Sequence, residues 1–252
     1  MHLHSIRNTL RTAVIRVSPS EPGSGITLNG IPANPKYVVR GDSNVVLRDG
    51  SNYAFTVEHP LALLRMCGIH DASVEGVEEE WEFARPQHRA AYALMLRPSA
   101  VLGSPDGTIS GGLMESVTKE MVNSEVQRSE VTLSETIIIA TDDGGRLEVH
   151  PAPKGTGLDI ELCLATLGPL KARFDPEYGL EPDELRLRVG KSVTAFIKGP
   201  MEESLYHALG DLIGDLAGTG GVDDAYVKAK FMRRYHYLTM SAVKKARLLP
   251  AD

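Results

Sequence analysis

The sequence predicts an α+β fold, in which short strands and a few helices form small sheets packed on helices. Two observations support this class: the first half of the chain contains several short strands followed by a helix, and the second half repeats that order. The chain has 252 residues, of which 42% are hydrophobic and 24% are charged. These proportions are typical of a globular protein that buries a sizeable core.

The first half of the chain alternates apolar and polar residues in short runs before one helix. Strands are expected at 12–19, 25–31, 36–41, 44–50 and 53–59, with another beginning at residue 72. A helix is expected from Pro60, whose preset φ and missing N–H suit the first helical position. Leu61, Leu64 and Cys67 then recur at helical spacing, and Gly68 is a suitable C-terminal stop.

A stretch rich in Gly, Pro, Ser and Asp at 103–112 separates the two halves. We therefore expect a first α+β domain over residues 1–105 and a second over residues 113–252. The second half contains a hairpin signal at Asp143-Gly144-Gly145. Further strands are expected at 157–167, 170–176 and 220–231, and helices at 202–217 and 232–249.

The net charge and the two cysteines indicate which binding partners and which cellular compartment to expect. The formal net charge of −6 argues against nucleic acid or an anionic membrane surface as the main partner. Cys67 and Cys163 lie in apolar runs, so we expect them to pack as small hydrophobic residues in a reducing compartment. No apolar run is long enough to cross a membrane. The sequence therefore predicts a cytoplasmic protein with no nucleic-acid partner and no integral membrane association.

The segment LYHALGDLIGDLAG contains the most informative pattern. His207, Asp211 and Asp215 follow one another at i, i+4 and i+8 along one stripe of the expected helix. Gly210 and Gly214 lie inside the same helix, where each costs about 1 kcal/mol against alanine. Glycines at these positions indicate that another part of the protein approaches the helix closely. An H-x-x-x-D pair is half of a zinc site, although the same spacing occurs in surface hydrogen-bonded pairs.

A second pair of titratable residues, Glu58 and His59, directly precedes the N-terminus of the first expected helix. We expect His59 at or beside the N-cap, with Glu58 just outside the helix. Taken alone, such a pair is typical of a solvated helix start. Together with the histidine and aspartate of the later helix, it offers a third metal ligand and a neighbouring carboxylate.

These segments resemble the zinc-binding motifs of the UDP-3-O-acyl-N-acetylglucosamine N-deacetylase (LpxC) family. TVEHPLALLRMCGIHDASVEG is similar to the family's E-H-L-x-A-A-L-x-G-x-G-I-D-N, and HALGDLIGD is similar to H-K-x-x-D-x-I-G-D. The opening LHS with VIRVSPSEPGSGI resembles the family's first β-segment, and RRYHYLTMSAV resembles K-S-G-H-A-L-N-N-A. The similarity touches both halves of the chain in the same order as in the family.

The resemblance implies a fold and a metal site. The fold would be a two-domain sandwich, with a small mixed or antiparallel sheet packed on helices in each domain and the helices between the sheets. His59, His207 and Asp211 would bind one Zn²⁺ ion and leave an open position for water. Glu58 would be the general base that takes a proton from this water.

The resemblance also implies roles for residues around the metal. His236 would stabilise the developing oxyanion or protonate the leaving amine, and Asp215 would orient it. Thr194 would be a substrate-binding residue, at the A-R-T-F motif of the family. Arg233 could replace the family's nucleotide-contacting lysine, and His4 of the LHS segment would line the site.

Several positions depart from the family pattern. Ala208 replaces the lysine that directly follows the second zinc histidine. Ala195 stands at the threonine of the A-R-T-F motif, and Thr194 is displaced by one residue. The connection between Phe196 and His207 is short, whereas the family inserts there a segment that forms a passage for an acyl chain.

The sequence therefore predicts a zinc-dependent N-deacetylase that acts on a small-molecule N-acyl amino sugar, free or nucleotide-linked. The metal ligands are retained and the lipid-recognition parts are absent, which favours a less lipidic substrate than the lipid A precursor of the family. Two alternatives stay open. One is a non-catalytic relative with a binding or regulatory role, and the other is a metal-free α+β interaction module in which His207 and Asp211 form a surface pair.

Overall fold

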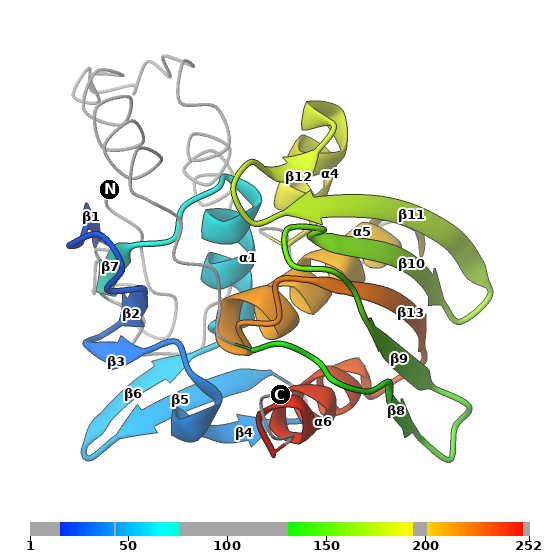
Figure 1. Cartoon of the computed structure of the whole chain (residues 1–252), viewed down its shortest axis with the longest axis horizontal. Coiled ribbons are helices and arrows are strands. Elements are labelled where there is room, and N and C mark those ends of the chain that lie inside the picture. The colour runs from blue at the N-terminus through cyan, green and yellow to red at the C-terminus, as the bar shows by residue number, and fades with distance from the viewer. Residues whose placement is uncertain (1–15, 43, 76–130, 194–200, 249–252) are drawn as a thin grey trace, which may run out of the picture.

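The computed structural model describes residues 16–42, 44–75, 131–193 and 201–248 (Figure 1). Within these residues the chain has an α+β architecture with three sheets and four α-helices. The predicted α+β class is therefore confirmed. The expected domain boundary at 103–112 lies outside the described residues and stays a prediction.

Two sheets form from the strands that precede residue 76. The first is mixed, in the order β1-β7-β2-β3, and the second is antiparallel, in the order β4-β5-β6. Their strands are β1 (Arg16–Pro19), β2 (Ile26–Leu28), β3 (Ile31–Pro32), β4 (Val38–Gly41), β5 (Val45–Asp49), β6 (Asn52–Phe55) and β7 (Ala72–Glu75). The expected strand 25–31 is split into β2 and β3, because Asn29 and Gly30 both have positive φ and form a tight turn.

Helix α1 (Glu58–Met66) begins earlier than expected. Thr56 has a positive φ of 53° and ends the preceding strand at Phe55. Glu58 is therefore the first helical residue, and Pro60 is the third rather than the first. Proline is tolerated there because the N–H groups of the first turn have no intrahelical partner. All residues of α1 are buried, so the interpretation of this segment as a solvated helix start is wrong.

A six-stranded sheet has the order β12-β11-β10-β13-β9-β8. Its strands are β8 (Ile137–Ala140), β9 (Arg146–Pro151), β10 (Leu158–Leu164), β11 (Leu167–Asp175), β12 (Gly179–Glu181) and β13 (Ala225–Phe231). Strands β10 and β13 pair in parallel, and the other neighbouring strands are antiparallel. The hairpin expected at Gly144 joins β8 to β9. The expected strand 157–167 is interrupted at Ala165, whose φ is 52°, and so supplies β10 and the start of β11.

The described part of the second half also contains three α-helices and a π-helical turn. These are α4 (Asp183–Val193), α5 (Met201–Ile213), η2 (Gly214–Thr219), which continues α5, and α6 (Tyr235–Leu248). Together α5 and η2 occupy the helix expected at 202–217, and α6 occupies the one expected at 232–249. The sequence prediction missed α4, although Leu185, Val189 and Val193 recur at helical spacing within its charged sequence DELRLRVGKSV.

Helices α1 and α5 and the turn η2 pack against one another near the middle of the view in Figure 1. Helix α5 also contacts β10 and β11, whereas α6 contacts β8, β9 and β4. One continuous hydrophobic core includes residues of both N-terminal sheets, α1, α5 and the six-stranded sheet. Among the described residues, no helix is long and apolar enough to cross a membrane.

Candidate metal centre

Helix α1 lies very close to η2, because Gly214 has no side chain. A Cβ atom added to Gly214 would lie 2.1 Å from the carbonyl oxygen of Glu58. A Cβ atom added to Gly210 would lie 2.2 Å from Cγ1 of Val193 in α4. The prediction that another part of the protein approaches these two glycines is therefore confirmed. The contact brings the start of α1 to the helix face that carries the other predicted metal ligands.

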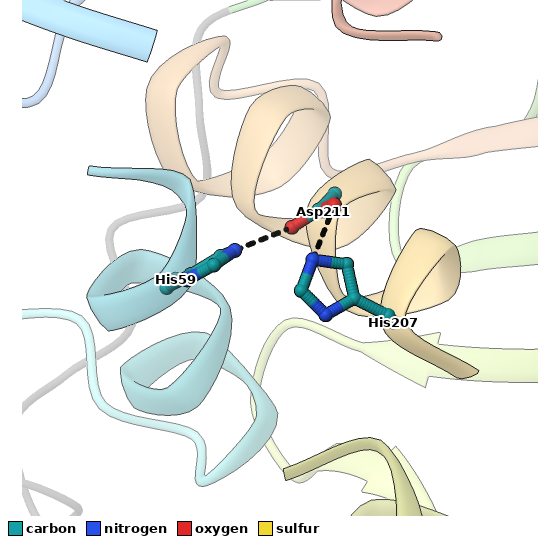
Figure 2. Close-up of side chains that lie close together, drawn as sticks. All are labelled: His59, His207 and Asp211. Atoms are coloured by element: carbon teal, nitrogen blue, oxygen red, sulfur yellow. Dashed lines mark ion pairs between the residues drawn. The ribbon is translucent and has the colours of Figure 1, made fainter. Parts of the chain in front are cut away.

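His59, His207 and Asp211 meet between α1 and α5, with imidazole nitrogens facing the carboxylate (Figure 2). Nε2 of His59 lies 3.1 Å from Oδ1 of Asp211, and Nε2 of His207 lies 3.2 Å from Oδ2. The ligand atoms of all three residues lie within 4.8 Å of one another. Asp211 is fully buried, so the interpretation of His207 and Asp211 as a surface pair is wrong.

This set of donor atoms suits a transition metal such as zinc. Zinc binds imidazole nitrogen and carboxylate oxygen at about 2.0–2.2 Å in a tetrahedron, which puts neighbouring ligand atoms about 3.3 Å apart. The nitrogen–oxygen distances of 3.1 and 3.2 Å are close to this spacing. Nδ1 of His207 lies 2.9 Å from the carbonyl oxygen of Ser192, and donation of Nδ1–H to this oxygen leaves the Nε2 lone pair facing the cluster. The cluster could therefore bind a metal ion.

The charges of the cluster depend on Asp211. Burial by itself would lower the pKa of His207, but the Asp211 carboxylate raises this pKa to about 9. Burial by itself would raise the pKa of Asp211, but His207 and His59 hold it well below its usual range. Burial lowers the pKa of His59. Asp211 is thus ionised, and His207 is a cation with a proton on each ring nitrogen. A metal ion would displace the proton on Nε2 when it binds.

Glu58 lies beside this cluster with its carboxyl group inside the protein. Oε2 accepts a hydrogen bond from the backbone N–H of Val45 at 2.9 Å, and Oε1 lies 4.0 Å from Nε2 of His236. Burial raises the pKa of Glu58 to about 8. The carboxylates of Asp211 and Asp215 add to this effect, and the imidazole of His236 opposes it. A carboxylate with a raised pKa is a stronger base than an exposed one, which suits proton abstraction near neutral pH.

His236 and Asp215 form a buried pair beside Asp211 and Glu58. Nδ1 of His236 lies 3.0 Å from Oδ2 of Asp215, and its Nε2 lies 3.6 Å from Oδ2 of Asp211. The hydroxyl of Thr239 donates to the same Asp215 oxygen at 2.5 Å. Burial by itself would lower the pKa of His236, but Asp215 and the two other carboxylates raise it to about 10. His236 is therefore a cation whose Nε2–H faces the cluster.

Two residues of α6 at this site, Thr239 and Tyr235, were not predicted from the sequence. Thr239 follows His236 by three residues, so helical spacing could have placed both on one face. Tyr235 directly precedes His236, and adjacent helical residues do not normally face the same way, so no spacing signal exists for it. The Tyr235 ring stacks on Phe231 with ring centroids 5.3 Å apart. Burial and the adjacent Asp211 carboxylate raise the pKa of Tyr235 well above its usual range.

The remaining predicted residues lie outside this cluster or outside the described chain. Arg233 is exposed in the loop before α6, where its backbone N–H donates to Oδ2 of Asp143 at 3.3 Å. Within the described structure it belongs to the surface rather than to the buried site. Thr194 and His4 fall among the residues that the structure does not describe, so their roles stay predictions. Ala208, which stands at the family's lysine position, is buried on α5.

No model of a known protein family matches this chain, and no curated protein is similar enough to it to identify a relative. The geometry of the site therefore carries the functional argument.

Proposed function

We propose that the protein is a zinc-dependent deacetylase that hydrolyses the amide bond of an N-acyl amino sugar. The observation that carries the proposal is one buried cluster of three potential metal ligands, a carboxyl group with a raised pKa and a cationic imidazole. Amide hydrolysis needs activation of water, a base for its proton, and stabilisation of the charge that develops on the carbonyl oxygen. Each requirement has a candidate residue in the cluster.

His59, His207 and Asp211 would hold the ion, which supplies Lewis acidity towards water and the amide carbonyl when bound. Glu58 is not needed as a ligand and is free to accept a proton from the attacking water. Its carboxyl group is oriented by the hydrogen bond from Val45, and its pKa of about 8 makes the ionised form a strong base. Glu58 is therefore proposed as the general base.

His236 would act on the other side of the reacting amide. Its proton on Nε2 faces the cluster, where it can stabilise negative charge or pass to the leaving amine nitrogen. Asp215 holds Nδ1 of the ring at 3.0 Å, and Thr239 holds the Asp215 oxygen in turn. Removal of Asp215 would deprive the buried imidazolium of its nearest counter-charge.

The sugar part of the substrate rests on the resemblance to the UDP-3-O-acyl-N-acetylglucosamine deacetylases. On this proposal the chain also shares the family's two-domain sandwich, with the helices between the sheets. The short connection between Phe196 and His207 leaves little chain to form an acyl passage. We therefore favour an N-acyl sugar that lacks a long acyl chain, either free or linked to a nucleotide.

A second candidate is a non-catalytic binding protein that keeps the metal ligands. The buried, apolar Ala208 favours it, because a lysine in that position could contact a phosphate or a substrate oxygen and alanine cannot. The two candidates differ in one outcome, since only the hydrolase releases an amine from its ligand.

The test is an assay of amine release by the zinc-loaded protein. The substrates are UDP-N-acetylglucosamine with and without a 3-O-acyl chain, and simple N-acetylated sugars. Amine release that is lost on substitution of Glu58 by glutamine would support the deacetylase. Zinc binding without amine release from any of these compounds would favour the binding protein.

A further inference from the structure

The last turn of α4 lies against the face of α5 that carries His207. The carbonyl oxygen of Ser192 lies 2.9 Å from Nδ1 of His207, and the Ser192 hydroxyl lies 2.8 Å from Oε2 of Glu203, one turn earlier in α5. The hydroxyl also lies 3.0 Å from the carbonyl oxygen of Arg188 in its own helix. Both polar groups of this buried serine are therefore within hydrogen-bond distance of one stripe of α5.

The contact with the Ser192 carbonyl determines which nitrogen of His207 keeps its proton. A backbone carbonyl can only accept a hydrogen bond, so Nδ1 of His207 must be the donor. Ser192 is the second-last residue of α4, and the last four carbonyl groups of a helix have no partner within the helix. This carbonyl therefore needs a donor from outside α4, and His207 supplies it. With the proton on Nδ1, Nε2 is the nitrogen that can bind a metal ion.

Gly210 permits this contact, because it lets α4 come close to α5. It lies three residues after His207, so both are on the same side of α5. A Cβ atom on Gly210 would lie 2.2 Å from Cγ1 of Val193 and 3.2 Å from Cγ1 of Val189, both in α4. The shorter distance is far inside van der Waals contact, so a side chain at position 210 would push α4 away from α5. The Ser192 carbonyl belongs to the peptide bond that joins Ser192 to Val193, and it would move with Val193.

We propose that Ser192 is a positioning residue of the metal centre, whose carbonyl group orients His207 to bind the ion through Nε2. Helix α4 is then part of the site, and Gly210 sets how closely it approaches. The inference rests on the proposed metal site but not on the reaction or the substrate. A hydrogen-bond acceptor on the other ring nitrogen fixes the orientation of a metal-binding histidine and raises its basicity, and both effects increase metal affinity.

The test is the zinc affinity of Gly210→Ala, measured by competition with a chelator of known affinity. Alanine favours a helix more than glycine does, so helix propensity cannot account for a loss of affinity. We expect the Kd for zinc to rise roughly 10- to 100-fold, the usual effect of losing the hydrogen-bond partner of a metal ligand. A variant that binds zinc as tightly as the wild type would overturn the proposal.

A second substitution distinguishes displacement of α4 from an effect on Asp211, which directly follows Gly210. Val193→Ala removes the methyl group that the new Cβ atom would meet, so Gly210→Ala/Val193→Ala should bring the Kd back close to the wild-type value. The matched control is Val193→Ala alone, which leaves a cavity and should lower the melting temperature without changing the Kd. A double variant that binds zinc as weakly as Gly210→Ala would show that the effect does not pass through α4, and would overturn the proposal.

A crystal structure of the zinc-loaded wild type gives a further test that needs no variant. Zinc on Nε2 of His207, with Nδ1 within about 3.2 Å of the Ser192 oxygen, would support the proposal. Zinc on Nδ1, or a longer distance between Nδ1 and this oxygen, would overturn it.

Failure of the proposed function would look different. A wild type that binds zinc but hydrolyses no amide would refute the reaction. Weaker zinc binding by Gly210→Ala, with recovery in the double variant, would still support this inference. A wild type that binds no zinc would overturn both.

Discussion

The backbone carbonyl of Glu58 lies so close to Gly214 that a Cβ atom on residue 214 would come within 2.1 Å of it. Glu58 is the first residue of α1, and Gly214 is the first residue of η2. This contact joins the two parts of the candidate site. His59 lies one residue beyond it in α1, and Asp211 lies three residues before it in α5.

The first prediction concerns Gly214. A Gly214→Ala substitution should destabilise the protein by about 1–3 kcal/mol, because added volume in a tightly packed contact forces the two helices apart. It should also weaken zinc binding, since the displacement separates His59 from Asp211. Urea unfolding and a zinc competition assay measure the two effects. A variant with wild-type stability and wild-type zinc affinity would show that the α1–η2 contact does not set the geometry of the site.

The second prediction tests whether Glu58 is a general base or a metal ligand. Glu58→Gln should keep the zinc content of the wild type and lower kcat by roughly 10²–10⁴, the usual scale for loss of a general base. The amide can still accept the hydrogen bond from Val45, so the fold should be retained. The control is Glu161→Gln on β10, a side chain that is 46% exposed and should not affect turnover. Loss of zinc from the Glu58 variant would make Glu58 a ligand instead.

The third prediction concerns the stability of the fold at acidic pH. His70 is buried, and its Nδ1 faces Nη1 of Arg65, which also forms an ion pair with Asp223 at 2.6 Å. Burial, followed by the positive charge of Arg65, lowers the pKa of His70 to about 3. The folded protein therefore holds His70 neutral, whereas the unfolded chain protonates it below about pH 6.5. Stability is present above that pH and is lost as the pH falls towards 3.

Between about pH 6.5 and pH 5 this one group should remove about 2 kcal/mol from the free energy of unfolding. His70→Gln keeps an acceptor for Arg65 and has no proton to gain. We expect the variant to lose less stability than the wild type over this pH range, as measured by urea unfolding at several pH values. Identical pH dependence in both proteins would show that His70 is not held neutral in the fold.

The fourth prediction concerns the substrate. If the acyl passage is absent, a longer 3-O-acyl chain should change kcat/KM very little. In a true hydrophobic passage each buried methylene would contribute about 0.8 kcal/mol, which is close to a fourfold gain per methylene. A series of substrates with increasing chain length distinguishes the two cases. A steep rise with chain length would mean that residues outside the described chain form a passage after all.

Local patterns in the sequence predicted the second half of the site well. His207 and Asp211 are four residues apart, and any helix places such a pair on one face. The interior glycines correctly indicated a close approach, although the sequence could not say what approaches. Gly210 meets Val193 of α4, whereas Gly214 meets the backbone of Glu58, which is about 150 residues away along the chain. Single-sequence periodicity carries no information on such contacts.

Other features depend on backbone geometry that residue patterns do not specify. The early start of α1 follows from the positive φ of Thr56, a threonine in a conformation that β-branched residues rarely adopt. The missed helix α4 packs against α5, and its apolar residues Leu185, Val189 and Val193 recur at helical spacing on its buried side. Tyr235 enters the site because Phe231 and the start of α6 orient its ring, which is a tertiary effect.

The central claim is a zinc ion held by His59, His207 and Asp211, and elemental analysis of the purified protein tests it most directly. The wild type should carry about one zinc ion per chain. Asp211→Ala should lose most of it, because the two remaining histidines form a far weaker tetrahedral site. The control is Asp143→Ala, which changes an exposed carboxylate in the β8–β9 turn and should keep the metal. Equal zinc content in the wild type and in Asp211→Ala, or no zinc in either after incubation with the ion, would contradict the claim.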